Sequence, residues 1–524
     1  MAQANSAEGV EGFARWMIVA TVGVGSIATI LTATIINVAV PDIMGAFGIG
    51  QDRAQWVSTG YLAATTAAML LTDYSIRRIG QRNTFILAIA VFIFGSIVGG
   101  MATNFTVLIF GRILQGAAAG ITQPLAMLAL FQIFPPNERG RAMGLYGMSV
   151  ILAPAVGPYV GGAMVDLFSW RYVFFMPVPF SAIAILMAAV SLRPREKGAA
   201  PPAFDWIGFA LASLFIAALL IGLTNGARDG WNANEVIATF VVAAAAIAAF
   251  IFWELRHAQP LLNLRLFGNP RFVSAVMVSF VFGGAIFASI YLVPLFLQIV
   301  QGYTPTRSGL LQLPAGLAMA VAFPLIGRLS DRGGQHLLTM AGLVVIAYSS
   351  FLMIGAHVDT PFWLFAGWMV LSRLGLSLVF PPLSAASLNV LPANMISQGS
   401  GVMNFSRSLG GAFGVNLIAI SVDFKSTNFR AALADTQHSG NAATLEFMAY
   451  VRRFFENAGF PDTLQEPMAL LYLDRTISLQ ADMLAFRGGF LLLAIATLAA
   501  VLPAWFMRPR KQPAVPDASA QAAS

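Results

Sequence analysis

The chain has 524 residues, of which 58% are hydrophobic and only 10% are charged, against about 25% charged residues in a soluble domain. A soluble protein of this size could not bury so much apolar surface, so we infer that the chain lies in a lipid bilayer. The net charge of +7 is spread over short connections rather than gathered on one face, which argues against nucleic acid as a partner. The chain has no cysteine and only four scattered histidines, so we expect no disulfide, no metal site and no cofactor.

Fourteen apolar segments follow one another along the chain, and each is long enough to cross a hydrocarbon core of ~30 Å as a helix. The first is too long for a signal peptide and is preceded by Glu8 and Glu11, so we expect it to be a membrane helix. The sequence therefore predicts an all-α polytopic membrane protein with 14 transmembrane helices. The segments run roughly 16–40, 56–72, 84–102, 105–128, 142–165, 173–192, 205–224, 235–253, 273–297, 309–327, 337–356, 361–381, 400–421 and 486–507.

The basic residues predict the orientation of the chain. With the N-terminus inside, the inner connections and termini collect 17 lysine and arginine residues, whereas the short outer loops hold four, namely Arg53, Arg171, Arg228 and Arg307. Basic residues concentrate on the cytoplasmic side of membrane proteins. We therefore expect both termini to be cytoplasmic.

A charged loop occurs twice. "DYSIRRIGQRN" (73–83) follows the second apolar segment and "GRLSDRGGQHL" (327–337) follows the tenth, and pairing Gly80 with Gly334 places the copies 254 residues apart. This repeat predicts two parallel six-helix bundles, with the seventh and eighth segments inserted between them. The expected units are an N-terminal bundle (1–192), a linker with two inserted helices (193–255), a C-terminal bundle (256–510) and a disordered cytoplasmic tail (511–524).

One expected loop, 422–485 on the outer side, is far longer than the others, and loops this long are uncommon unless they are functional. Within it, residues 443–459 have helical spacing and predict an amphipathic helix. An amphipathic lid without a partner is the alternative to a docking function. The predicted apolar face contains Leu445, Met448, Val451, Phe454 and Phe455.

Three further motifs accompany the repeated loop. "LIFGRILQGAAAG" (108–120) carries an arginine inside an apolar segment, "GLYGMSVILAPAVGPYVGG" (144–162) is rich in glycine and proline, and "GSGVMNFSRSLGGAFG" (399–414) combines glycines with another arginine. Small residues let helices pack closely. Together with the loop pattern G-x-L-x-D-R-x-G, these motifs resemble the major facilitator superfamily, in its fourteen-helix drug:proton antiporter branch. The resemblance covers essentially the whole chain.

This resemblance implies roles for named residues. The charged loops would gate the inner side, and an Asp–Arg pair there can join neighbouring helices and act as a conformational switch. Arg112 would take part in proton coupling; the alternative is a structural hydrogen-bond anchor, since an intramembrane arginine requires a cavity or a partner. The expected gating residues are Gly327, Asp331, Arg332, Gly334 and Arg78, and the antiporter motif on the fifth span comprises Gly144, Gly157, Pro158, Gly161 and Gly162.

The first copy of the loop departs from the family pattern. Asp73 stands where the second copy has Gly327, and Arg77 stands where it has Asp331. An arginine cannot accept hydrogen bonds. We therefore expect only the second copy to keep the family's gating chemistry; anchoring of the topology is the alternative role for the arginines of the first copy.

Two usually acidic positions of the family are also altered, to Thr32 and Gly488, and we find no acidic residue well inside the apolar segments. Arg112, Arg373 and Arg407 instead bring positive charge to the expected pathway, which favours neutral or anionic amphiphilic substrates. The polar residues expected to line the substrate site, each with an interhelical hydrogen bond as the alternative role, are Thr32, Asn37, Gln115, Gln123, Asn404 and Arg407. Trp56 and Tyr61 are expected to be anchors at the membrane interface.

The sequence thus predicts a transporter rather than an enzyme, namely a proton-driven exporter of drug-like or toxic compounds in the bacterial inner membrane. It has no nucleotide-binding loop. A specific metabolite or siderophore exporter of the same fold is the first alternative, and a membrane sensor or enzyme is a remote one. The resemblance further implies a periplasmic adaptor protein and an outer-membrane channel as partners.

Overall fold

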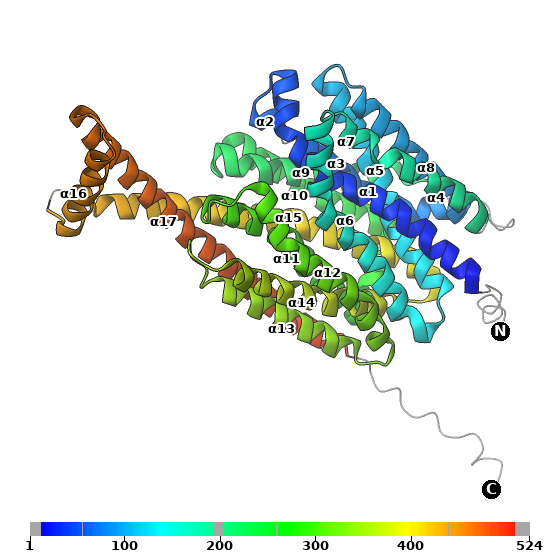
Figure 1. The fold of residues 1–524 in the computed structure, drawn as a ribbon. Helices are drawn as coiled ribbons and strands as arrows, with labels where there is room; N and C mark the ends of the chain where they lie inside the picture. Colours follow the sequence, from blue (N-terminus) through cyan, green and yellow to red (C-terminus); the bar gives the residue numbers. More distant parts are fainter. Residues whose placement is uncertain are drawn as a thin grey trace, which may run out of the picture.

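The computed structural model describes residues 12–54, 56–192, 194, 203–257, 260–438 and 440–508, and the regular secondary structure of these residues is helical throughout (Figure 1). Twelve helices in this part of the chain are long and apolar enough to cross a membrane. The two remaining predicted spans, 56–72 and 142–165, are helical as well. The prediction of an all-α polytopic membrane protein is confirmed, while the expected tail 511–524 lies outside the described residues.

The helices form two bundles and an inserted pair. The first bundle contains α1 (Gly12–Phe47), α3 (Trp56–Ala68), α4 (Leu71–Gly100), α5 (Phe105–Ile133), α6 (Arg139–Leu167), α7 (Tyr172–Phe175) and α8 (Pro177–Ser191). The inserted pair consists of α9 (Trp206–Asp229) and α10 (Asn234–Arg256). The second bundle contains α11 (Pro270–Ile299), α12 (Pro305–Asp331), α13 (Gln335–Met353), α14 (Phe362–Asn389), α15 (Ile396–Asp435), α17 (Asp462–Ala499) and α18 (Val501–Trp505). Short elements α2 (Gln51–Ala54), η1 (Pro136–Glu138), η2 (Leu264–Gly268) and η3 (Ala393–Met395) connect them.

A glycine with positive φ marks the same turn in both bundles. α4 changes direction at Gly80, where φ is 83°, so that its first residues continue the second predicted span and its remainder forms the third. Gly334, with φ 70°, lies between α12 and α13. This backbone region is accessible to glycine at little cost. The alignment of the two charged loops therefore pairs two glycines with positive φ, although their ψ angles, 161° at Gly80 and 24° at Gly334, differ.

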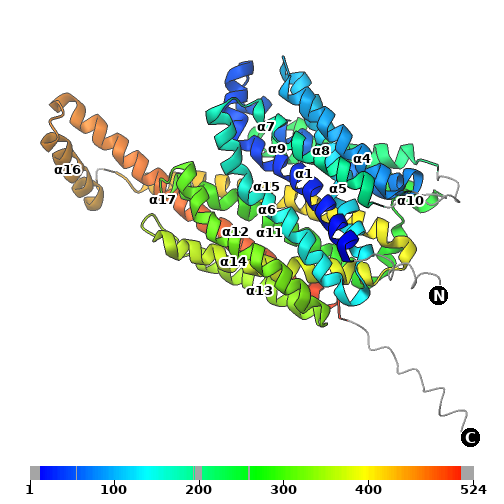
Figure 2. The same ribbon diagram turned by 45° about the vertical axis from the view of Figure 1, so that its right-hand side comes forward.

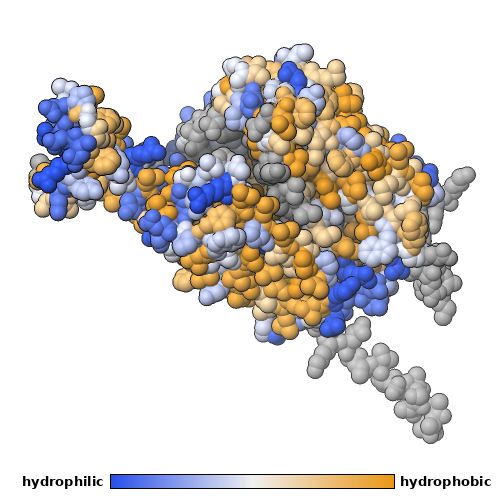
Figure 3. All heavy atoms as spheres, in the orientation of Figure 1, coloured by the Kyte–Doolittle hydropathy of each residue, from blue (hydrophilic) through white to orange (hydrophobic). Residues whose placement is uncertain are grey.

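The two bundles meet along a few helices. α6 packs against α12 and α14, and α15 packs against α3, α4 and α5 (Figures 1 and 2). The inserted pair, α9 with α10, packs through α9 onto α3 and α15, beside the boundary between the bundles. On the face seen in Figure 3, hydrophobic residues cover most of the bundle surface between hydrophilic patches at its ends, as expected for a surface that faces lipid.

A helical arm projects from one end of the bundles. We call residues 422–485 the projecting arm. It consists of the C-terminal part of α15, of α16 (Ala442–Asn457) and of the N-terminal part of α17 (Figure 1). The expected loop is thus largely helical, because α15 and α17 continue beyond the bundle. The helix predicted within 443–459 is confirmed, but the prediction of its buried face is only partly right. Val451 and Phe455 are buried, whereas Leu445 and Phe454 are exposed.

Candidate functional site

Arg112 is the largest fully buried side chain of the first bundle, and α5 places it between α1 and α3. Its Nε donates to the carbonyl oxygen of Val57 at 2.9 Å. Its Nη1 donates to Gln115 Oε1 at 3.0 Å and to the carbonyl oxygen of Thr32 at 3.4 Å. The guanidinium also lies 4.3 Å from the centre of the Tyr61 ring, in cation–π geometry. We call these five residues the Arg112 cluster.

The positive charge of Arg112 has neutral partners. The ion pairs among the described residues join Arg15 to Glu138 and Arg77 to Asp73, and neither involves this cluster. Nη2 of Arg112 is buried and has no hydrogen-bond partner among the described residues. A buried unpartnered donor on a cation is costly and is characteristic of sites that receive a ligand or a second charge.

Tyr61 was expected at the membrane interface, and this prediction is wrong. Its side chain is 4% exposed, and its hydroxyl donates to the carbonyl oxygen of Thr29 at 2.9 Å. The tyrosine thereby connects α3 to α1 and supplies the ring beneath Arg112. Trp56, the first residue of α3, is 42% exposed, in agreement with an anchor at the membrane interface. The position of Tyr61 inside an apolar segment, rather than at its end, was the sequence signal that could have predicted its burial.

A second polar cluster crosses from one bundle to the other. Asn404 and Arg407 lie one turn apart on α15, and Arg407 Nη2 donates to Asn404 Oδ1. Tyr146, on α6, donates its hydroxyl to the same oxygen at 3.2 Å and to the carbonyl oxygen of Gln123 at 3.1 Å. Arg407 lies 5.0 Å from the centre of the Phe380 ring. We call these five residues the Arg407 cluster.

The polar residues predicted to line one site are therefore divided between two clusters. Thr32 and Gln115 join Arg112, and Gln123 and Asn404 join Arg407. The side chain of Asn37 lies outside the described residues. Sequence reasoning missed Tyr146 and Ser96; Ser96 accepts a hydrogen bond from Gln115 Nε2 at 2.8 Å and so fixes the orientation of that amide.

The second charged loop joins the two bundles. Asp331, the last residue of α12, accepts hydrogen bonds from the backbone N–H groups of Gly140 and Arg141 at 2.5 and 3.0 Å. These N–H groups belong to the first turn of α6, where they have no partner within the helix and where the helix dipole favours an anion. We call this interaction the α6–α12 contact. It lies at the end of the bundles where α1 begins, since Arg15 pairs with Glu138 at 3.5 Å.

The residues around Asp331 behave differently from the family expectation. Arg332 is exposed and forms no ion pair within the described part of the chain, so the expected Asp–Arg interaction is replaced by one between aspartate and backbone. Gly327 and Gly140 permit the approach: a Cβ on Gly327 would lie 2.7 Å from the carbonyl oxygen of Gly140. Gly334 provides the turn that follows.

Glycines of the predicted antiporter motif face two different helices. A Cβ on Gly144 would lie 2.6 Å from the carbonyl oxygen of Phe323 on α12. Gly157 faces Thr34 and Gly161 faces Ile35, both on α1. Gly162 has ordinary space around it, and the side chain of Pro158 lies outside the described residues. The motif therefore lets α6 approach α12 at one end and α1 further along.

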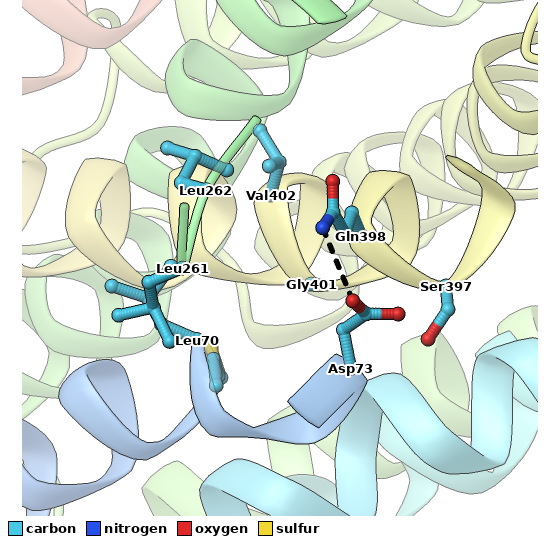
Figure 4. A pocket seen from close by; sticks show the side chains of 9 residues that line it. Leu70, Asp73, Leu261, Leu262, Ser397, Gln398, Gly401 and Val402 are labelled. Atoms are coloured by element: carbon cyan, nitrogen blue, oxygen red, sulfur yellow. Dashed lines mark hydrogen bonds between the residues drawn. The ribbon is translucent and has the colours of Figure 1, made fainter. Parts of the chain in front are cut away.

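The first charged loop makes a related contact with altered chemistry. Asp73 on α4 accepts a hydrogen bond from Gln398 Nε2 on α15 at 3.1 Å and pairs with Arg77 one turn later (Figure 4). Gly401 approaches the carbonyl oxygen of Met69 here, as Gly144 approaches that of Phe323 in the second copy. The aspartate is thus displaced by one helical turn and still joins the two bundles. Sequence analysis recognised the loss at position 77 but missed this replacement.

The neighbourhood of Asp73 contains a small cavity of about 10 Å³, room for about one water molecule. Leu261 and Leu262, which follow the inserted pair, line it together with Gln398 and Ser397 (Figure 4). Arg78, expected in the gating loop, donates to the hydroxyl of Tyr74 on its own helix at 2.8 Å.

Comparison with known proteins places these features in a family context. A sequence profile described as the Major Facilitator Superfamily matches residues 22–415. The chain is 32% identical to the multidrug export protein EmrB of Escherichia coli (strain K12) over 395 residues, which cover 74% of this chain and 76% of that one. It is 30% identical to the fatty acid resistance protein FarB of Neisseria gonorrhoeae over 420 residues, covering 78% and 81%.

The fold also has a counterpart among solved structures. The proton:xylose symporter XylE superimposes with a TM-score of 0.60 and covers 94% of this chain and 96% of its own, at 12% sequence identity. The two proteins therefore share the fold, and at this sequence identity the likeness concerns the fold alone.

Proposed function

The chain belongs to the major facilitator superfamily, and we propose that it exports amphiphilic drug-like or toxic compounds from a bacterial cell, driven by the proton gradient, with a preference for neutral or anionic substrates. The names of its relatives EmrB and FarB support export of toxic amphiphiles. We place it in the inner membrane with both termini in the cytoplasm, as the distribution of basic residues favours. The two bundles would alternate in exposing the substrate site to either side.

The substrate preference rests on Arg112. Its guanidinium is fully buried, has neutral partners and keeps one free donor nitrogen. A cationic substrate entering this region would face an uncompensated positive charge, whereas an anionic or strongly hydrogen-bonding group would satisfy it. Arg407 adds a second buried guanidinium at the boundary between the bundles. The name of FarB, a fatty acid resistance protein, is consistent with amphiphilic anions.

The altered position at Gly488 supports the same preference. A Cβ on Gly488 would lie 2.5 Å from Nζ of Lys425, so the ammonium group occupies the space that a side chain at position 488 would need. Where the family usually has a carboxylate, this chain therefore presents a cation. The change from an acidic to a basic environment reduces the attraction for cationic drugs.

The α6–α12 contact supports gating. It joins the bundles through Asp331 at the end where the chain begins, and it uses hydrogen bonds that can form and break without unfolding either helix. We assign it to the closed cytoplasmic side of the transport cycle. Opening of this contact would release α12 from α6 and give substrate access from the cytoplasm.

The proposed function is tested by transport into proteoliposomes with an imposed proton gradient. The probes are 8-anilino-1-naphthalenesulfonate, a permanently anionic amphiphile, and ethidium, a permanently cationic one. We expect gradient-driven transport of the anion and none of the cation. We also expect Thr32→Asp to introduce ethidium transport, because it adds a carboxylate to α1 at the residue whose backbone carbonyl contacts Arg112. Ethidium transport by the wild-type protein that survives Thr32→Ala would contradict the substrate preference. Transport of neither probe in either gradient direction would contradict the function itself.

We further propose that the projecting arm docks a periplasmic adaptor protein. The arm extends well beyond the bundle, and it exposes aromatic side chains such as Tyr450 and Phe454, which are 72% and 61% exposed. Tyrosine and phenylalanine are enriched where protein partners bind. Tyr450→Ser with Phe454→Ser should abolish co-purification of the adaptor and cellular resistance while leaving transport in proteoliposomes unchanged. Unchanged co-purification and resistance after deletion of 440–470 would show that the arm is not the dock.

A further inference from the structure

Two buried carboxyl groups face each other at the base of the inserted pair. Asp205 caps the N-terminus of α9 and Glu254 lies in the last turn of α10, and each side chain is 4% exposed. Asp205 Oδ2 and Glu254 Oε1 have no hydrogen-bond partner among the described residues. Both oxygens lie beside Gly208, where an added Cβ would be 2.7 Å from Glu254 Oε1 and closer still to Asp205 Oδ2. The free oxygens of the two carboxyl groups are therefore near neighbours in a space that only glycine leaves open.

The surroundings of the two carboxyl groups differ. Asp205 Oδ1 accepts hydrogen bonds from the N–H of Gly208 at 2.8 Å and from Trp253 Nε1 at 2.9 Å, and the N-terminus of α9 favours its negative charge. Glu254 accepts one longer hydrogen bond, from the N–H of Leu262 at 3.2 Å, and the C-terminal end of α10 disfavours its negative charge. The surroundings therefore stabilise the negatively charged form of Asp205 more than that of Glu254, and a proton binds preferentially to Glu254.

Among the described residues, neither of the two groups belongs to an ion pair that would offset their repulsion. The elements packed around the pair present an apolar cluster that includes Leu70, Phe250, Leu261 and Phe405. On α10 itself, His257 stacks on the ring of Trp253, with the ring centres 5.3 Å apart. Arg256, two residues after Glu254, lies 3.9 Å from the centre of the Phe252 ring and forms no ion pair in the described part of the chain. Asp73, which pairs with Arg77 of α4, lies at the cavity that Leu261 and Leu262 line. Two adjacent buried carboxyl groups that lack a cation do not both ionise readily.

We propose that Asp205 and Glu254 form a proton-binding site that contributes to the coupling of transport, an inference that rests on the proposed function for its role in transport. The proton resides on Glu254 Oε1 and is shared with Asp205 Oδ2. Binding of this proton changes the net charge of the pair from −2 to −1. Unlike Asp73, which is buried but paired with Arg77, these two carboxyl groups belong to no ion pair within the described residues. The site also gives a chemical role to the inserted helices, which neither Arg112 nor the substrate site explains.

The pair is connected to the boundary between the bundles. Glu254 Oε2 holds the N–H of Leu262, and Leu261 and Leu262 line the small cavity beside Asp73 and Gln398 (Figure 4). Loss of the shared proton leaves two like charges adjacent in apolar surroundings, and their repulsion acts on the segment that Glu254 holds. A change in protonation is thereby transmitted to the contact between α4 and α15.

The test uses the full-length protein with Glu254→Gln, and with Glu235→Gln as the matched control, since Glu235 is an exposed acid at the other end of the same helix. Infrared spectroscopy of the purified protein during alkaline titration should show the carbonyl signal of a protonated carboxyl group. We expect this signal in the wild type and in Glu235→Gln and its loss in Glu254→Gln. A signal unchanged by Glu254→Gln would overturn the assignment, and so would a signal that sodium ions remove at constant pH.

Transport measurements test the role of the proton. In proteoliposomes, Glu254→Gln should retain exchange of 8-anilino-1-naphthalenesulfonate without a gradient but lose its stimulation by a pH gradient, whereas Glu235→Gln keeps both. Gly208→Ala, which retains both acids but displaces their oxygens, should reduce the stimulation as well. If a pH gradient stimulates transport by Glu254→Gln as strongly as transport by the wild type, the proposed role of Glu254 in coupling is overturned. Absence of stimulation in the wild type would instead overturn the proposed function, while the infrared result decides separately whether the pair holds a proton.

Discussion

Replacing Asp331 by asparagine weakens the α6–α12 contact with little change of shape. The carboxylate accepts two backbone hydrogen bonds at the N-terminus of α6, and asparagine keeps one acceptor oxygen and loses the charge. A hydrogen bond to a charged group contributes ~1.5–3 kcal/mol, and an anion at a helix N-terminus ~0.3–1 kcal/mol. We therefore expect the closed state to lose about 2–3 kcal/mol, which shifts its equilibrium with the open state roughly 30- to 150-fold.

The assay exploits the absence of cysteine from the chain. Ser330 is fully buried beside the contact, and its hydroxyl has no partner in the described part of the chain. Ser330→Cys therefore introduces a single thiol that a water-soluble maleimide reaches only when the contact opens. Asp331→Asn in this background should raise the labelling rate by the factor above. Asp359→Asn, which changes an exposed aspartate in the connection between α13 and α14, should leave the labelling rate unchanged. If Asp331→Asn in the Ser330→Cys background is labelled no faster than Ser330→Cys alone, the assignment of the α6–α12 contact to the closed cytoplasmic side is refuted.

Three further substitutions test the packing and the Arg112 cluster. Gly144→Ala places a Cβ 2.6 Å from the carbonyl oxygen of Phe323 and should destabilise the closed state by ~1–3 kcal/mol, seen as a lower Tm in detergent, whereas Gly162→Ala should leave Tm unchanged. Arg112→Lys should greatly reduce transport of the anionic dye in a protein that still purifies as a folded species, because one ammonium group cannot reproduce the planar fork of donors. Tyr61→Phe removes one interhelical hydrogen bond and should cost about 1 kcal/mol in unfolding measurements while transport persists.

The sequence determined the features that depend on local chemistry. The length and hydropathy of each segment predict a membrane helix, because an apolar helix satisfies its own backbone groups in lipid whatever surrounds it. The repeated loop also paired Gly80 with Gly334, and both have a positive φ, which glycine adopts at little cost. The repeated charged loop led to the prediction of two six-helix bundles with two inserted helices between them.

The tertiary structure decided which polar groups meet. Asp331 joins backbone N–H groups of α6 rather than an arginine, and Asp73 takes over the contact of the first loop from a position one turn earlier. Asp205 and Glu254 each lie at the edge of a predicted span, and nothing in either segment indicates that their free oxygens face each other. Such pairings depend on how far one helix is rotated and shifted against another. That register is set by the packing of whole helices, so residues distant in the sequence become partners only in the assembled bundles.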